Sequence, residues 1–148
     1  GLISNGNLTM LFAFPLTIEN AQGEKSTLCI IISVEPDGSL ICGSSVSVGS
    51  ALHINSPSAE AVLKTAANTV NWIKEMRGRD LLLIFSCFSH SIAMVESSEE
   101  MKFIRRELAG LSFPYIFVYS GGEICPLKNE LGTQANRYHN YAIISCVL

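Results

Sequence analysis

Short apolar runs separated by polar turns dominate the first third of the chain. The run over residues 11–18 predicts a strand, which Pro15 restricts to a sheet edge or a bulge because proline has no N–H to donate. Residues 26–34 form a β-branched run, and residues 39–48 carry apolar side chains at even positions. A short strand over residues 51–54 follows. Together these runs predict an antiparallel meander.

Two later segments have apolar residues at helical spacing. The first begins at Ser56-Pro57, a serine cap followed by proline at the first helical position, and ends at Arg77-Gly78. The second begins with Ser97 and Glu100 at the spacing of a capping box. Between them, the apolar run over residues 80–88 predicts a strand buried on both faces.

Two more strands complete the prediction, over residues 115–119 and at the end of residues 138–148. The fold class is therefore α+β, an antiparallel-rich mixed sheet packed with two main helices in the order β-β-β-(β)-α-β-α-β-β. We expect one domain over residues 1–148, in which the polar residues 1–9 are loosely ordered.

The composition limits the classes of function. The chain is 48% hydrophobic and 16% charged, with a mean hydropathy of +0.33. Its apolar runs are too short to span a bilayer, so we expect a large core or an apolar face that meets a partner. The net charge is −3 and Arg105-Arg106 is the longest basic run, which argues against nucleic acid as a partner.

The five cysteines are widely spaced and include no C-x-x-C pair. Zinc and thioredoxin-type chemistry therefore have no support, and a reducing, cytoplasmic location is expected. Cofactors have no support either, because the chain has no G-x-G-x-x-G, G-x-x-x-x-G-K or H-E-x-x-H motif. The first residues do not resemble a signal peptide. Gly1 in place of a methionine suggests a natural protein that begins earlier.

The candidate chemistry centres on residues 115–126. A buried strand breaks at Ser120-Gly121-Gly122, and the carboxylate of Glu123 follows directly. Two adjacent glycines allow close approach of another chain or a ligand. An acid in this position predicts a site, although an exposed glutamate in a surface turn is the commoner case.

A cysteine–histidine enzyme is a weaker hypothesis. Cys87, His139 and Asn140 supply the residue types of a thiol catalyst, but the neighbours His139 and Asn140 cannot orient each other. Cys87 also ends an apolar run, as a packed cysteine does. His90 is expected in a loop.

Three stretches together resemble one family. They are Phe85-Ser86-Cys87, residues 119–126 (YSGGEICP) and His139-Asn140-Tyr141. This order is similar to the C-terminal half of the FIST sensory domain, the FIST C domain. Residues 14–16 and 34–40 resemble its early elements. One departure is that Ser89-His90 stands where the family has Gly-Arg, and a histidine is not permanently charged as an arginine is.

The resemblance implies a non-catalytic, bacterial-type input module for signal transduction. Its partners would be a small ligand, with amino acids proposed, and either the FIST N half, which this sequence lacks, or an output domain. Glu123 would pair a ligand ammonium, Asn140 and Tyr119 would donate or accept hydrogen bonds, and Gly121-Gly122 would offer backbone donors. The expected ligand-binding residues are Cys87, His90, Tyr119, Gly121, Gly122, Glu123, His139 and Asn140.

Two alternatives remain open. In the first, Glu123 and His139-Asn140 only tie the last strands together, and the chain is an interaction module that packs on a FIST N half. In the second, Cys87 is the nucleophile of an enzyme.

Overall fold

The computed structural model describes residues 11–19, 27–76, 80–94, 98–128 and 134–148. Its contacts group the chain into two compact units. The first unit comprises residues 1–56 and 124–140, and the second comprises residues 57–123 and 141–148. The predicted loose segment over residues 1–9 and the predicted helix signals at Arg77-Gly78 and Ser97 lie outside the described residues. A single domain over the whole chain stays a prediction.

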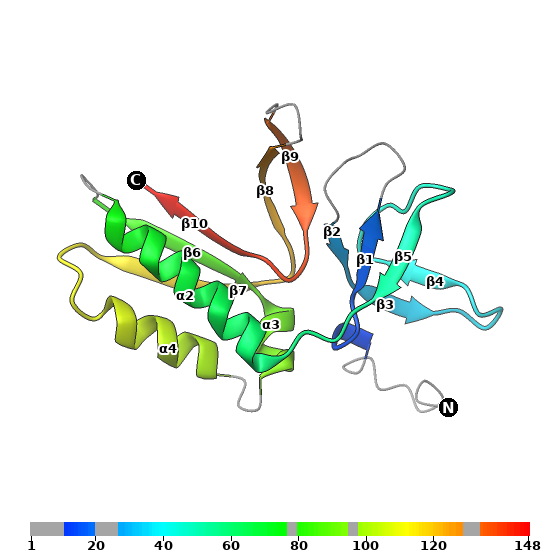
Figure 1. The fold of residues 1–148 in the computed structure, drawn as a ribbon, viewed down its shortest axis with the longest axis horizontal. Helices are drawn as coiled ribbons and strands as arrows, with labels where there is room; N and C mark the ends of the chain where they lie inside the picture. The colour runs from blue at the N-terminus through cyan, green and yellow to red at the C-terminus, as the bar shows by residue number, and fades with distance from the viewer. Residues whose placement is uncertain (1–10, 20–26, 77–79, 95–97, 129–133) are drawn as a thin grey trace. The chain divides into compact units, whose positions relative to one another are not determined.

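The first unit consists of antiparallel strands (Figure 1). Its three-stranded sheet has the order β2-β1-β5, and two hairpins pair β3 with β4 and β8 with β9. The bounds are β1 (Leu16–Glu19), β2 (Thr27–Cys29), β3 (Ile31–Val34), β4 (Leu40–Cys42), β5 (Ala51–Ile54), β8 (Glu123–Lys128) and β9 (Gln134–His139). The strands of the first third are antiparallel, as predicted, but they do not form a meander, because β5 pairs with β1 and not with β4.

The predicted run over residues 26–34 is interrupted at Ile30, which separates β2 from β3. The N–H of Ile30 donates to Oδ1 of Asn140 at 3.2 Å, and its carbonyl accepts from the N–H of Gly43 at 2.9 Å. Ile30 therefore satisfies its backbone groups with partners distant in sequence, and local β-propensity could not reveal the break.

Three other boundaries differ from the prediction. Pro15 precedes β1, so this strand begins at Leu16 and does not include residues 11–15. The strand predicted over residues 39–48 ends at Cys42. Pro126 lies within β8, and β9 follows over a polar stretch in which the sequence pattern predicted no strand. Prolines are accepted in two-stranded sheets because every strand there has a free edge.

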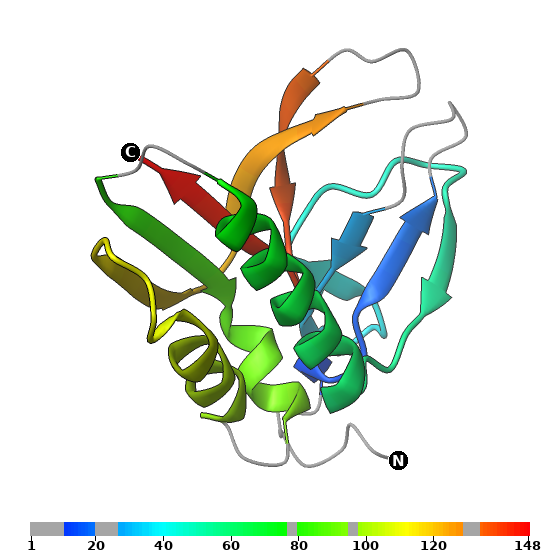
Figure 2. The same ribbon diagram turned by 60° about the vertical axis from the view of Figure 1, so that its left-hand side comes forward.

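The second unit is a three-stranded mixed sheet with helices packed on it (Figures 1 and 2). The strand order is β10-β6-β7, with β7 parallel and β10 antiparallel to the central β6. The bounds are α2 (Ala59–Glu75), β6 (Leu82–Cys87), α3 (Phe88–Ala93), α4 (Glu99–Leu108), β7 (Tyr115–Ser120) and β10 (Ile143–Val147). This arrangement confirms the α+β class and the mixed sheet.

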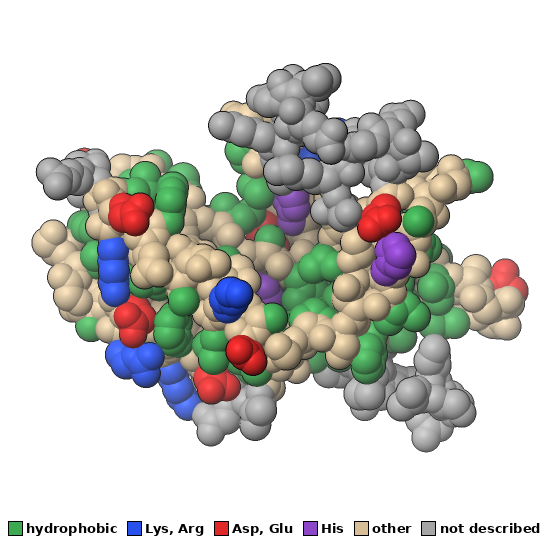
Figure 3. All heavy atoms as spheres, viewed as in Figure 1, with side chains coloured by type: hydrophobic (Ala, Val, Ile, Leu, Met, Phe, Trp, Pro, Cys, Tyr) green, Lys and Arg blue, Asp and Glu red, His purple; other side chains and the backbone are tan. Residues whose placement is uncertain are grey.

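Helices α2 and α4 share one core with the sheet. Val70 and Ile73 of α2, Ile84 of β6, and Ile104 and Leu108 of α4 are all at most 2% exposed and form one cluster. Burial of such side chains stabilises the fold by roughly 1.5–3 kcal/mol each. The outer surface of these helices carries both acidic and basic side chains (Figure 3), as a solvated helical layer does.

Helix α2 begins two residues later than predicted. Its N-cap is Ser58, whose hydroxyl accepts a hydrogen bond from the N–H of Ala61 at 3.1 Å, so Ser56 is not the cap. Its buried residues are Val62, Ala66, Val70 and Ile73, which follow helical spacing. No helix among the described residues is long and apolar enough to cross a membrane.

Helix α3 was not predicted, because His90 was expected in a loop. The helix has only six residues and its N-cap, Cys87, makes no side-chain cap hydrogen bond. Isolated helices of this length are unstable in water. The helix therefore depends on tertiary contacts, and its sequence carries no periodicity that could predict it.

We predict that Gly43→Ala destabilises the first unit. An added methyl group would lie 2.9 Å from Cγ1 of Ile30 and 3.2 Å from Oδ1 of Asn140, closer than packed atoms tolerate. Overpacking of this kind costs about 1–3 kcal/mol, measurable by chemical denaturation followed by circular dichroism. The matched control is Gly110→Ala, where the methyl group meets nothing within 4 Å. Equal stability of the two variants would contradict the prediction.

Candidate functional site

The carboxyl ends of β6 and β7 place several predicted site residues together in the second unit. The two strands are parallel, and Cys87 at the end of β6 pairs in register with Ser120 at the end of β7. Cys87 leads into α3, which carries His90, and Ser120 leads into the turn that carries Gly121 and Glu123. The carboxyl ends of parallel strands are a common location of ligand sites.

The start of β10 completes the same edge of the sheet. Ile143 pairs in register with Ser86, and the N–H of Cys87 donates to the carbonyl of Ala142 at 2.9 Å. Tyr141 has a φ of 54°, and its ring centroid lies 5.8 Å from that of His90. A left-handed conformation in a bulky residue is rare, and such strain is often found at functional sites.

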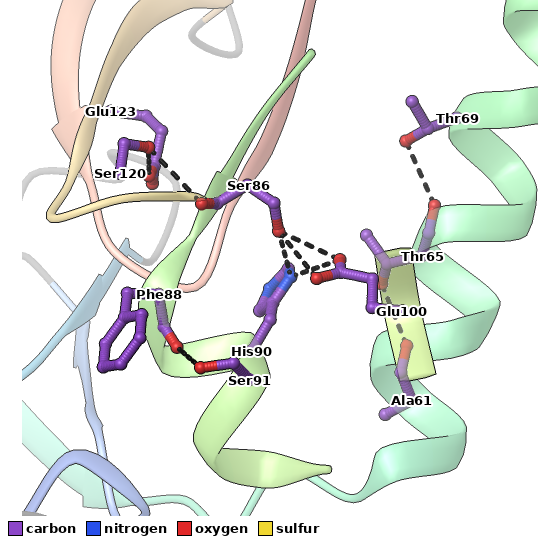
Figure 4. A network of polar contacts seen from close by, with 10 residues as sticks. All are labelled: Ala61, Thr65, Thr69, Ser86, Phe88, His90, Ser91, Glu100, Ser120 and Glu123. Atoms are coloured by element: carbon purple, nitrogen blue, oxygen red, sulfur yellow. Dashed lines mark hydrogen bonds and ion pairs between the residues drawn. The ribbon is translucent and has the colours of Figure 1, made fainter. Parts of the chain in front are cut away.

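A buried network joins three elements of this unit (Figure 4). Ser86 of β6, His90 of α3 and Glu100 of α4 are each at most 2% exposed. Nδ1 of His90 lies 2.8 Å from Oε1 of Glu100, and the Ser86 hydroxyl lies 2.9 Å from both carboxylate oxygens. This ion pair and its hydrogen bonds fix both helices to the central strand.

The network is not a catalytic triad, although it contains a serine, a histidine and an acid. The Ser86 hydroxyl lies 3.0 Å from Nδ1 of His90, the same nitrogen that contacts Glu100. A triad needs the serine and the acid on opposite ring nitrogens, so that the imidazole can transfer a proton between substrate and nucleophile. The contacts of Ser86 and Glu100 with Nδ1 therefore fix the orientation of the His90 ring.

Tyr119 adds a third donor to the same carboxylate. Burial raises the pKa of Tyr119, and the charge of Glu100 and a hydrogen bond to it raise it further. The Tyr119 ring also makes edge-to-face contacts with Phe88 and Phe117, at 6.4 Å and 5.1 Å between centroids. Burial raises the pKa of Tyr141 to about 12. Both phenols are therefore neutral donors near neutral pH.

Glu123 is the second buried carboxylate of the unit, at 4% exposure. The Ser120 hydroxyl donates to its Oε1 at 2.5 Å (Figure 4). Its Oε2 is buried and has no hydrogen-bond partner. Since nearly all buried polar atoms in folded proteins are paired, an unpaired carboxylate oxygen requires an explanation.

The electrostatics of Glu123 agree with its incomplete hydrogen bonding. Burial raises the pKa of Glu123 above its ordinary value of 4.5, since the charged form is desolvated. The Ser120 hydroxyl, the charge of His90, the Ala142 N–H and the Cys87 thiol offset this effect only in part. These four groups therefore do not fully offset the free-energy cost of burying the charged carboxylate of Glu123.

The other two predicted site residues, His139 and Asn140, belong to the first unit. Asn140 is 3% exposed, accepts from the Ile30 N–H and donates from Nδ2 to the Tyr138 hydroxyl at 3.2 Å. Its amide therefore has a structural role that holds β9 against the break between β2 and β3. Nε2 of His139 is buried and has no hydrogen-bond partner.

The predicted turn glycines differ in exposure. Gly121 is exposed and an added methyl group there would meet nothing within 4 Å, whereas Gly122 is partly buried. Gly121 also takes part in a polar interaction. The proposal that their backbone N–H groups face a ligand stays a prediction.

Sequence reasoning missed Ser86, Glu100, Ser120 and Tyr141 as site residues. Glu100 was interpreted as part of a capping box, but its side chain is fully buried against His90. The one available signal was its position on the apolar side of α4, four residues before the buried Ile104.

Metal chemistry has no support in the part of the chain that the structure describes. No group of three or more His, Cys, Asp or Glu side chains in this part could hold a metal ion. All five cysteines are free thiols, and Cys87 is 1% exposed. A thiol buried to this extent behaves as a packed side chain.

Comparison with protein families agrees with the resemblance seen in the sequence. The family model of the FIST C domain matches residues 2–126 of the 148 residues. The chain therefore belongs to the FIST C domain family, which is a family of sensory-type domains in signal transduction proteins. No curated protein and no solved structure gave a match.

We predict that Glu100→Ala destabilises the second unit by about 3–5 kcal/mol, because it leaves the His90 imidazole and the Ser86 hydroxyl buried without their partner. The matched control is Glu99→Ala, on the same turn of α4 but partly exposed, which should cost less than about 1 kcal/mol. Urea unfolding measures both. Similar losses in the two variants would show that the network does not stabilise the fold.

We also predict that Glu123→Gln stabilises the protein near neutral pH. A carboxyl whose pKa is raised by folding holds its proton more tightly in the folded state, so the free energy of unfolding falls as the pH rises above 4.5. Glutamine cannot ionise and avoids this loss. The gain should vanish as the pH falls below 4.5, and unfolding curves over a pH series measure it. A loss of stability, or a gain independent of pH, would contradict the prediction.

Proposed function

We propose that the chain is a non-catalytic sensory module, located in the cytoplasm, that binds a small molecule at the end of β6 and β7. The observation that carries this proposal is the buried, unpaired Oε2 of Glu123. Family membership supports a sensory role, and the unpaired oxygen supports a ligand with a hydrogen-bond donor, such as the amino group of an amino acid.

The buried, incompletely hydrogen-bonded carboxylate of Glu123 destabilises the folded state, which supports a binding role for this residue over a structural one. A carboxylate that served only to tie strands together would be fully hydrogen-bonded, as Glu100 is. Natural proteins commonly retain destabilising residues where function needs them. A ligand cation at Oε2 would supply the missing interaction and stabilise the folded state.

An interaction module remains the second candidate, and β7 carries the observation that favours it. Ile116 and Val118 are 51% and 42% exposed. They alternate with Tyr115 and Phe117, which pack against the core shared with α2 and α4. The two side chains therefore lie on the opposite face of the sheet, where a partner such as a FIST N half would bury them.

A thermal-shift screen of amino acids and small amines tests the proposed ligand site. Binding at about 100 times Kd stabilises the native state by about 2.7 kcal/mol, which raises Tm by several degrees. We expect this shift with the wild-type protein and with Glu75→Gln, a control at an exposed position at the end of α2. We expect no shift with Glu123→Gln. If no compound shifts Tm, the proposal fails and the interaction module becomes the better explanation.

A further inference from the structure

The buried charges of the second unit do not balance. The charged side chains buried among the described residues are His90, Glu100 and Glu123, and no described lysine or arginine is buried. Even a protonated His90 leaves one of the two carboxylates without a countercharge. A buried charge is costly unless it is paired, so ionisation of both carboxylates requires one positive charge that the described residues do not supply.

The missing charge belongs to Glu123 and not to Glu100. Glu100 accepts hydrogen bonds from the Ser86 and Tyr119 hydroxyls and from Nδ1 of His90. Glu123 accepts from the Ser120 hydroxyl on Oε1, and the Ala142 N–H and the Cys87 thiol also favour its charged form, but its buried Oε2 has no hydrogen-bond partner and none of these groups carries a positive charge. Oε2 is thus the carboxylate oxygen that lacks a hydrogen-bond donor.

His90 cannot serve as a fixed anion-binding group in this arrangement. A carboxylate has no proton to donate, so Nδ1 of His90 must carry the proton that faces Glu100 at 2.8 Å. Nε2 is a donor only in the doubly protonated ring, so His90 does not provide the permanent charge of an arginine. An arginine would have bound a carboxylate with two hydrogen bonds, but no described arginine is buried.

We propose that the Glu123 site recognises a net-cationic amine, a protonated amino group without a neighbouring carboxylate, in preference to a zwitterionic amino acid. This inference rests on the proposed ligand site at Glu123. An ammonium group supplies the charge that the site lacks and N–H donors for Oε2. A carboxylate beside it would add a third negative charge to an interior that holds two. The ligand is therefore an amine, an amide or an ester of an amino acid, and not the free acid.

Amide and acid pairs of equal size test this inference. Glycinamide is compared with glycine, and alaninamide with alanine, by calorimetry and thermal shift on the 148-residue chain near neutral pH. The variants are Glu123→Gln and the exposed control Glu75→Gln, with circular dichroism to verify that both are folded. We expect each amide to bind at least about tenfold more tightly than its acid, a difference of about 1.4 kcal/mol. This binding should be lost in Glu123→Gln and kept in Glu75→Gln.

The other outcomes separate the two proposals. If an acid binds within tenfold of its amide, or more tightly, and this binding is lost in Glu123→Gln, the inference is wrong while the ligand site at Glu123 stands. If no member of any pair binds, or if binding persists in Glu123→Gln, both the inference and the proposed ligand site are wrong.

Discussion

The carboxylate of Glu100 is the point on which the second unit depends. It lies on α4, is fully buried, and accepts hydrogen bonds from residues of β6, α3 and β7. Because each donor comes from a different element, the carboxylate determines where α3 and α4 lie against the sheet. Helix α3 is too short to be stable alone, so its position depends on the ion pair between His90 and Glu100. The apolar core of α2, β6 and α4 provides most of the stability, and the ion pair selects one arrangement.

The two buried carboxylates of this unit illustrate how structural and functional residues differ physically. Glu100 is fully hydrogen-bonded, and its removal leaves buried donors without a partner. Glu123 has an unpaired oxygen, and burial raises its pKa. An unpaired buried carboxylate such as that of Glu123 does not by itself stabilise a folded protein. The left-handed backbone of Tyr141 beside the same site adds a further unfavourable local feature, and both features are consistent with a site that is completed by a ligand.

The parts of the fold that could be predicted are those in which local pattern and tertiary position agree. The stripe of α2 and the apolar run of β6 bury most of the side chains that their spacing indicates. The strand over residues 115–119 was expected to be buried, but Ile116 and Val118 of β7 are exposed, because only its other face packs on the core. The errors occur where a distant residue decides local structure. Ile30 separates β2 from β3 because Asn140 and Gly43 take its hydrogen bonds. β8 can contain Pro126 because each strand of a two-stranded sheet has a free edge. The polar sequence of β9 has no periodicity that indicates a strand.

For the site, the sequence by itself determined the α+β class, the family, and the position of Glu123 after a glycine turn at the end of an apolar strand. It also indicated that Cys87–His90 and Gly121–Glu123 follow strand ends, and parallel pairing of β6 with β7 brings those ends to one edge. Only the tertiary structure decided that Glu100 is buried against His90, and that one oxygen of Glu123 lacks a partner. The physical reason is that burial and hydrogen-bond pairing depend on contacts between residues far apart in the chain, and a carboxylate on a helix looks the same in sequence whether it faces water or a histidine.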